Sequence, residues 1–258
     1  MSKVYLIGAG PGAGDLLTLR AARILADEAE VVLADELVSA EVLSLVRSQA
    51  RILKVGKRGG KASTPQAFIE RLMLRYARQG RTVVRLKGGD PFMFGRGGEE
   101  LLTLRAAGFE AEVVSGLTAG IAVPATLGIP VTHRGLAAGV TFVTARAGTQ
   151  GSPEPDWAAL AKTGTTLVIY MGLARLGEIT RELLAAGLAP HTPAAVIAQG
   201  CQPEQQQVIT TLVELPEAAG LPAPAIIVIG AVVSLAQADR LSGLAGLTSL
   251  DNPLRHAA

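Results

Sequence analysis

The sequence has little cysteine, few aromatic side chains and little net charge, and each shortage argues against a class of protein. A single cysteine, Cys201, among 258 residues excludes a disulfide-stabilised scaffold. Aromatic residues make up 3% of the chain, too few for a platform that stacks nucleic-acid bases. The formal net charge of +2 is also weak for a DNA-binding protein. We therefore expect no nucleic-acid partner.

Long apolar runs are missing as well. The longest, residues 225–236, is interrupted by Gly230 and Ser234 and is too short to span a bilayer. The apolar start at residues 4–7 ends at Gly8 and lacks the hydrophobic region of a signal peptide. We therefore expect a cytoplasmic protein with no membrane partner. With 49% hydrophobic residues, the chain still has enough apolar surface for a sizeable core.

The charge is unevenly distributed along the chain. Residues 1–117 hold 17 Lys and Arg against 13 Asp and Glu, whereas residues 118–258 hold 7 against 9. A mildly basic first half suits an anionic small molecule. A chance imbalance on a solvated surface explains the same numbers.

Short β-branched runs alternate with longer amphipathic stretches. This alternation predicts βαβ units, and the length favours two α/β domains with mostly parallel sheets. We place the N-terminal domain at residues 1–115, the C-terminal domain at 116–245 and a tail at 246–258. The predicted strands are residues 4–7, 31–34, 52–55, 82–86, 112–114, 141–144, 166–170, 194–198, 207–211 and 225–229. The predicted helices are residues 16–27, 40–47, 65–79, 98–107, 117–126, 157–162, 175–186 and 231–236.

The first glycine-rich turn follows residues 4–7 and precedes a helix. This arrangement lets backbone approach a ligand closely and points N–H groups toward it. Gly8, Gly10 and Ala13 match the dinucleotide fingerprint, and Asp35 follows the next strand, where an acid holds a ribose. An NAD(P)-dependent oxidoreductase is therefore one hypothesis. Pro11 argues against it, because proline removes one N–H from the turn. A tight turn without a ligand is the simpler alternative.

The second glycine-rich segment, residues 84–100, also joins a strand to a helix. It has six glycines within residues 88–98, which a structural turn rarely needs because each costs chain entropy. Gly88 and Gly89 permit close backbone approach, and Asp90 is suited to accept hydrogen bonds from a ligand. Arg96 and Glu99, three residues apart at a helix start, are expected to reach one pocket.

An ordered series of motifs resembles the tetrapyrrole methylases over roughly residues 3–235. Together the motifs are highly specific, although each alone is weak. They are Gly8-Ala-Gly-Pro-Gly12 with Leu16-Leu-Thr18, Asp35-Glu-Leu-Val-Ser39, Val55-Gly-Lys-Arg-Gly59, the run from Leu86 to Glu100, Gly116-Leu-Thr-Ala119, the run from Gly128 to Arg134, Tyr170-Met-Gly172, and the run from Pro224 to Gly230. The resemblance implies a homodimer with a tetrapyrrole methylase-like fold and a ligand cleft between its two domains.

The resemblance also implies S-adenosylmethionine as methyl donor and two successive methylations of uroporphyrinogen III. Positions that match the family's binding motifs for this donor are Pro11, Gly88, Gly89, Asp90, Met93, Thr118, Ala119, Met171 and Gly200. Ala225, at the start of the last strand, is expected near the adenine. Thr118 caps its helix or bonds a ligand carboxylate, and Met171 packs on a ligand or in the core. No nucleophilic side chain is required, because the electron-rich ring supplies the attacking carbon.

Acid–base and substrate-binding roles fall on five further positions. Asp35 and Lys57 match the acid–base candidates, and Arg96, Glu99 and Arg134 match positions that face the tetrapyrrole. We favour Asp35 over Glu99 as general base, because it follows a strand at the ligand-binding edge of the sheet. Alternatively, Asp35 caps the next helix. Lys57 is a proton donor, a carboxylate anchor or part of a solvated basic loop.

The chain departs from the family pattern in a few places. Ala13 stands where Asp is usual, Cys201 where Thr is common, and Ser115 where Pro is common. The helix before Asp35 is one residue longer than is usual in the family. These changes concern ligand contacts rather than family membership.

The histidines and the single cysteine argue against a metal site. His133, His191 and His256 show no metal-ligand spacing with Cys201, so we predict no metal. A later corrin-ring methylase is the rival within the family. Two alternatives come from other functional classes: a tetrapyrrole carrier without catalysis and the NAD(P)-dependent oxidoreductase.

Overall fold

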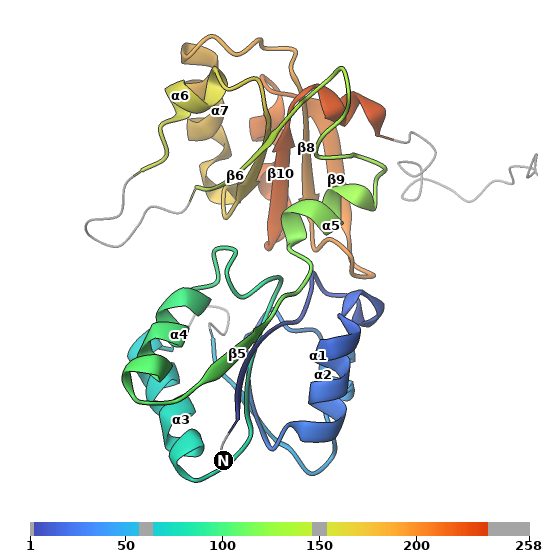
Figure 1. The fold of residues 1–258 in the computed structure, drawn as a ribbon. Helices are drawn as coiled ribbons and strands as arrows, with labels where there is room; N and C mark the ends of the chain where they lie inside the picture. The colour runs from blue at the N-terminus through green and yellow to red at the C-terminus, as the bar shows by residue number, and fades with distance from the viewer. Residues whose placement is uncertain (1–2, 57–63, 146–153, 237–258) are drawn as a thin grey trace, which may run out of the picture.

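The computed structural model describes residues 3–56, 64–145 and 154–236, which form two lobes, each built around one β-sheet (Figure 1). The first sheet takes its strands from residues 4–114 and the second from residues 140–229. All ten predicted strands are present, and every end lies within one residue of its prediction. The expected two α/β domains are therefore confirmed. The exact boundary at residue 115 stays a prediction, and the tail at 246–258 lies outside the described residues.

The first sheet is parallel throughout, in the order β3-β2-β4-β1-β5. Helices α1 and α2 cover one face, and α3 and α4 cover the other (Figure 1). The strands are β1 (Val4–Gly8), β2 (Val31–Ala34), β3 (Arg51–Lys54), β4 (Val83–Lys87) and β5 (Ala111–Val114). The helices are α1 (Leu19–Arg23), α2 (Ala40–Ser44), α3 (Gln66–Arg78) and α4 (Gly97–Ala106).

Alternation along the strands explains this sandwich. Tyr5 and Ile7 pack with the α1 and α2 side, whereas Val4 and Leu6 pack with the α3 and α4 side. Successive side chains of a strand point to opposite faces, so a strand buried on both sides needs apolar residues at nearly every position. The carboxyl ends of all five strands consequently share one edge, where ligands bind in α/β sheets.

The second sheet is mixed, in the order β6-β7-β10-β8-β9. Only β6 and β7 pair in parallel, whereas β10 pairs antiparallel with both β7 and β8, and β8 with β9. Across the described residues, five of eight strand pairings are thus parallel, and all the antiparallel ones lie in this sheet. The strands are β6 (Val140–Thr144), β7 (Thr166–Tyr170), β8 (Pro193–Ala198), β9 (Gln206–Thr211) and β10 (Ala225–Ile229).

Helices also cover both faces of the second sheet. Two of them, α6 (Trp157–Ala161) and α7 (Leu176–Ala185), cover one face, and α5 (Ala119–Ala125) covers the other (Figure 1). None of the helices in the described ranges is both long and apolar enough to cross a membrane. The cytoplasmic location stays a prediction.

The helix predicted at residues 16–27 is divided in the structure. A 3-10 turn spans Gly14–Leu16, and α1 begins only after Thr18, whose side chain accepts a hydrogen bond from Ala21 N at 3.3 Å. A π-helical turn, Ile24–Glu28, follows directly and ends with Ala29 N donating to Ile24 O. A π turn accommodates one extra residue in a helix. The one-residue difference from the family stays a prediction.

Candidate functional site

The carboxyl ends of β1 and β4 meet in a contact that involves backbone alone. A Cβ on Gly8 would lie 2.5 Å from both Gly116 N and Gly89 O. Gly10 N donates to Gly89 O at 3.2 Å, and Gly89 N donates to Gly10 O at 2.7 Å. Real Cβ atoms do not approach backbone so closely, so glycine is required at position 8 by packing. The two glycine-rich turns are therefore one structure.

Asp90 joins this structure to the segment between the two sheets. Its Oδ1 accepts a hydrogen bond from Phe92 N at 2.8 Å, and its Oδ2 accepts one from Gly116 N at 3.1 Å. Each carboxylate oxygen keeps a second lone pair for a ligand. Asp90 consequently fixes the turn and still offers acceptors.

A cavity of about 240 Å³ opens beside Asp90. Three of the predicted cofactor-binding residues, Asp90, Met93 and Thr118, line it. The full lining is Asp90, Phe92, Met93, Gly116, Leu117, Thr118 and Ile121. It combines one carboxylate with large apolar side chains, which suits a small molecule that has both polar and apolar parts.

Strained backbone gathers in loops that follow strands. Among the described residues, five that are not glycine have positive φ angles, and all of them follow β4, β7 or β8. Left-handed conformations cost about 1–3 kcal/mol for such residues and cluster at functional sites. The five are Phe94, Arg96, Met171, Gln199 and Cys201.

Tyr170, the last residue of β7, ties the second domain to the cavity wall. Its hydroxyl lies 2.6 Å from Thr118 Oγ1 and accepts a hydrogen bond from Gly120 N at 2.6 Å. Its ring lies 5.0 Å from the ring of Phe94 in the first domain. Thr118 occupies the N-cap position of α5 but makes no side-chain cap bond, so Tyr170 takes the place of the predicted cap.

The glycine turns of the first domain also touch the loop after β8. A Cβ on Gly12 would lie 2.7 Å from Gln202 Cγ. Gly200 packs so tightly against Val123 of α5 that a Cβ there would clash. Burial raises the pKa of the neighbouring Cys201 thiol, and Asp15 of the first domain raises it further. Loops from both domains therefore converge at one edge.

The remaining predicted cofactor residues lie around this convergence without lining the cavity. Gly88 packs against Leu37, Pro11 lies in the first turn, and Ala119 begins α5. Met171 follows β7 and is 45% exposed, so its alternative role as a core methionine is wrong. Ala225 begins β10 opposite Ala198 of β8.

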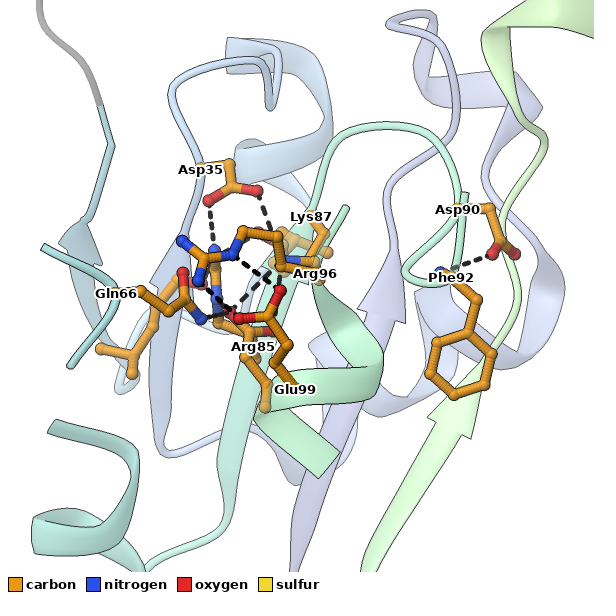
Figure 2. A network of polar contacts seen from close by, with 11 residues as sticks. Asp35, Gln66, Arg85, Lys87, Asp90, Phe92, Arg96 and Glu99 are labelled. Carbon is orange, nitrogen blue, oxygen red and sulfur yellow. Dashed lines mark hydrogen bonds and ion pairs between the residues drawn. The ribbon is translucent and has the colours of Figure 1, made fainter. Parts of the chain in front are cut away.

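A cluster of four charged side chains lies beneath the same edge, between the first sheet and helices α3 and α4 (Figure 2). Arg85 of β4 pairs with Asp35 and, at 3.0 Å, with Glu100 of α4. Lys87 lies 3.1 Å from Glu100 Oε2 and 3.9 Å from Asp35 Oδ2. Gln66 of α3 donates to Glu100 Oε1 at 3.0 Å. Two cations and two anions thus balance in a buried space.

Only Asp35 of this cluster was among the predicted site residues. The signal for the others lies in the strand itself, where Arg85 and Lys87 alternate with apolar residues. Alternation is typical of a strand with one solvated face. Here α3 and α4 cover that face, and both side chains are almost completely buried.

The neighbours set the protonation preferences of the two cations. Burial lowers the pKa of the Lys87 ammonium, and the nearby charge of Arg85 lowers it further. Burial also acts against the charged form of Arg85, but Asp35 and Glu100 outweigh it and raise the pKa of Arg85. Arg85 consequently remains a fixed positive charge beside Asp35.

Asp35 does not cap the following helix. Ser39 is the N-cap of α2, and its Oγ accepts a hydrogen bond from Val42 N at 3.2 Å. Asp35 instead projects at the carboxyl end of β2, with 27% of its side chain exposed. The capping hypothesis is therefore wrong, and the carboxylate is available at the ligand-binding edge.

Arg96 and Glu99 bind each other at the start of α4. Arg96 Nε donates to Glu99 Oε1 at 2.9 Å, and both side chains are 55% exposed. The hydrogen bond from Arg96 lowers the pKa of the Glu99 carboxyl. A lowered pKa makes Glu99 a weaker base.

Two predicted residues are not brought to this cluster by the described structure. Lys57 lies outside the described residues. Arg134 lies exposed in a turn of the second domain, closed by two backbone hydrogen bonds between His133 and Ala137. In the described parts of the chain, no group of three or more His, Cys, Asp or Glu is arranged to hold a metal ion.

The sheet order contradicts the dinucleotide-binding interpretation. In that fold the first two strands are neighbours. Here β4 lies between β1 and β2. Asp35 is therefore one strand further from the Gly8 turn.

Comparison with known proteins places the chain in a family. The model of the Tetrapyrrole (Corrin/Porphyrin) Methylases matches residues 3–216. A uroporphyrinogen-III C-methyltransferase of Pseudomonas aeruginosa is 54% identical over 233 residues, which cover 89% of this chain and 94% of that protein. A siroheme synthase of Tolumonas auensis is 50% identical over 96% of this chain, but the match covers only 52% of its own length.

A solved structure agrees with this placement. The uroporphyrin-III C-methyl transferase of Thermus thermophilus, complexed with S-adenyl homocysteine, is 42% identical and superposes with a TM-score of 0.78. The match covers 91% of this chain and 100% of that one. The fold and the sequence comparisons thus point to the same family.

Proposed function

Because the chain belongs to the tetrapyrrole (corrin/porphyrin) methylase family, we propose that it transfers two methyl groups from S-adenosylmethionine to uroporphyrinogen III. The additions at C2 and C7 give precorrin-2. The observation that carries this substrate is the 54% identity to the Pseudomonas aeruginosa enzyme over nearly its whole length. The downstream product, sirohaem or cobalamin, depends on other activities.

The residues at the cavity fit the methyl donor. A Cβ on Gly89 would point to within 4.0 Å of Ala119 N and Thr118 Cα, so the missing side chain leaves room beside the cavity wall. Leu117 and Ile121 offer apolar contact for a flat ring, and Asp90 offers acceptors for hydroxyl or ammonium groups. When bound, S-adenosylmethionine supplies an electrophilic methyl group on sulfur.

The protein's contribution to methyl transfer is alignment. A pyrrole carbon of the substrate forms the new bond to the methyl group while the bond from that methyl to sulfur breaks. No nucleophilic side chain takes part, so the loops after β1, β4 and β7 must hold the two reactants in line. Such positioning contributes about 7–11 kcal/mol in well-oriented reactions.

Asp35 completes each methylation by removing a proton. The methylated ring carries a positive charge, and when a ring C–H bond breaks, its electron pair returns to the ring. Asp35 takes the proton on a carboxylate oxygen. Its place at the carboxyl end of β2 supports this role, because Arg85 fixes one side of the carboxylate and solvent or substrate reaches the other.

Arg96, Arg134 and Lys57 are proposed to bind the carboxylates of the substrate. Replacing Arg96 by alanine is expected to abolish most turnover and leave the affinity for S-adenosylhomocysteine intact, because a guanidinium fork matches a carboxylate. Calorimetry and a turnover assay check both halves. Arg105→Ala, which removes an exposed arginine from the same helix, is the matched control. An equal loss of S-adenosylhomocysteine affinity would place Arg96 at the cofactor instead.

Thermal unfolding with added ligands tests the cofactor class. Stabilisation by a ligand follows its affinity for the folded state. S-adenosylhomocysteine is expected to raise the melting temperature, and NADH is expected to leave it unchanged. A rise in melting temperature with NADH but not with S-adenosylhomocysteine would contradict the methyl donor and favour an NAD(P)-dependent oxidoreductase.

We further propose that the enzyme is a homodimer in the cytoplasm. This proposal follows from the resemblance to the tetrapyrrole methylase family. Light scattering coupled to size exclusion measures the mass directly, and a mass of one chain, 26.5 kDa, would contradict the dimer.

A further inference from the structure

Glu100 is a carboxylate with no exposed surface, in a helix whose neighbouring Glu99 is half exposed. Its Oε1 accepts hydrogen bonds from Arg85 Nε and Gln66 Nε2 at 3.0 Å each and from Lys87 Nζ at 3.3 Å, and its Oε2 lies 3.1 Å from the same ammonium. Three donors from β4 and α3 therefore converge on one side chain of α4. Glu100 is therefore the centre of the charged cluster, whose members Asp35, Arg85 and Lys87 are labelled in Figure 2.

The contacts continue from Glu100 to Asp35 through Arg85. The Arg85 guanidinium donates to Asp35 Oδ1, to Leu33 O at 3.1 Å and to Leu86 O at 3.3 Å, besides its bond to Glu100. Every nitrogen of the guanidinium is thus engaged, and the group has one orientation. Asp35 is consequently held by a residue that cannot turn away from it.

Lys87 supports the same carboxylate from a second direction. Its ammonium lies between Glu100 and Asp35, 3.9 Å from Asp35 Oδ2. A Cβ on Gly95 would lie 3.3 Å from Lys87 Cε, so the lysine side chain also lies beneath the loop that carries Arg96. The cluster therefore underlies both the proposed base and the loop above it.

Stability alone does not explain such a cluster. Taking the three buried charges out of water is costly, and replacing buried ion pairs by apolar residues is often neutral or stabilising. Exposure rises along the contacts, from 0% for the Glu100 side chain and 2% for Arg85 to 27% for Asp35. Asp35, which lies at the ligand-binding edge, is thus the most exposed member of the cluster.

We propose that Glu100 is a positioning residue for methyl transfer: it fixes Arg85 and Lys87, and these hold the Asp35 carboxylate in the orientation that accepts the substrate proton. This role rests on the proposed function. Glu100 touches neither substrate nor methyl donor, and it acts only through Asp35. Groups that orient a catalytic ligand from behind typically change its performance by about 10–100-fold.

A double-mutant cycle between Glu100 and Asp35 tests the proposal. For Glu100→Gln we expect kcat to fall by about 10–100-fold, with KM and S-adenosylhomocysteine affinity unchanged. In an Asp35→Asn background the same change is expected to cause no further loss, because the residue it positions is already disabled. Losses that multiply in the double variant, or a wild-type kcat for Glu100→Gln, would overturn the proposal.

A second variant covers the case in which Glu100→Gln does not remain folded at the assay temperature. Arg85→Lys keeps the positive charge but lacks the fork that holds Asp35. The same fall in kcat, again absent in the Asp35→Asn background, supports the proposal, and additive losses overturn it.

The control is Glu30→Gln, which removes a carboxylate that also pairs with an arginine, Arg81, at the amino end of β4. It is expected to keep the wild-type kcat, and a fall equal to that of Glu100→Gln would overturn the proposal. The wild-type assay separates the two levels of the account. A wild-type protein that transfers no methyl to uroporphyrinogen III contradicts the proposed function. An active wild type in which the Glu100 and Asp35 variants lose activity independently contradicts only the role of Glu100.

Discussion

Replacing Asp35 by asparagine is expected to slow methyl transfer by about 100–10,000-fold, the range typical for loss of a general base. Asparagine keeps the shape of the side chain and its contact with Arg85, but it does not accept the ring proton. Substrate and cofactor binding are expected to persist. Steady-state turnover with labelled S-adenosylmethionine measures the rate through proton removal, and calorimetry measures the two affinities.

Asp27→Asn is the matched control, because Asp27 lies exposed in the π turn before β2. It is expected to turn over at the wild-type rate. Should Asp35→Asn also keep that rate, Asp35 would be only the structural partner of Arg85, since Ser39 already caps α2. A loss of binding with an unchanged rate would make Asp35 a substrate contact.

Placing alanine at Gly8 is expected to destabilise the protein by about 1–3 kcal/mol, as overpacking does. The new Cβ would lie 2.5 Å from Gly116 N and Gly89 O, and neither atom belongs to a flexible side chain. The backbone must shift, and Asp90 is bonded to the same Gly116 N. A displacement near 1 Å costs about 100-fold in rate, so kcat/KM is expected to fall with stability.

Gly98→Ala provides the contrast for this prediction. A Cβ on Gly98 would meet no atom within 4 Å, and the residue lies inside α4. Alanine in a helix is favoured over glycine by about 0.5–1 kcal/mol, so this variant is expected to be slightly more stable. Equal melting temperatures for the two variants would contradict the close approach of the glycine turns.

The central strands were predictable because their residues are buried on both sides. Runs such as residues 166–170 and 225–229 are continuously apolar or β-branched. Such a run predicts a buried strand whatever the order of the strands in the sheet. Strand direction was not predictable, since the same runs serve parallel and antiparallel pairs. This explains why β10, antiparallel to both of its neighbours, departs from the parallel expectation.

Single helix ends and buried charges were harder to predict. Both Leu16 and Thr18 are reasonable helix starts, and only the hydrogen bond of Thr18 to Ala21 decides between them. Glu100 follows Glu99 in the sequence, yet one is buried and the other half exposed. The helical rotation of α4 against β4 makes that difference, and it depends on packing rather than on residue type.

The roles of the candidate site residues stay predictions, although the structure brings three of them together. Asp90, Met93 and Thr118 line one cavity. The sequence predicts that Gly8 lets the backbone approach a ligand. The structure shows that position 8 must be glycine because a Cβ there would clash with the backbone of Gly116 and Gly89. Asp35 was selected from its place after a strand, and the structure adds the Arg85 contact that orients it.

The most direct test of the account is a methyl-transfer assay on the purified protein. It combines uroporphyrinogen III, generated anaerobically, with S-adenosylmethionine labelled on the methyl group. The account predicts two labels per ring and the absorption spectrum of precorrin-2. Binding of S-adenosylhomocysteine without any transfer would contradict it and direct the search for a substrate to later corrin intermediates.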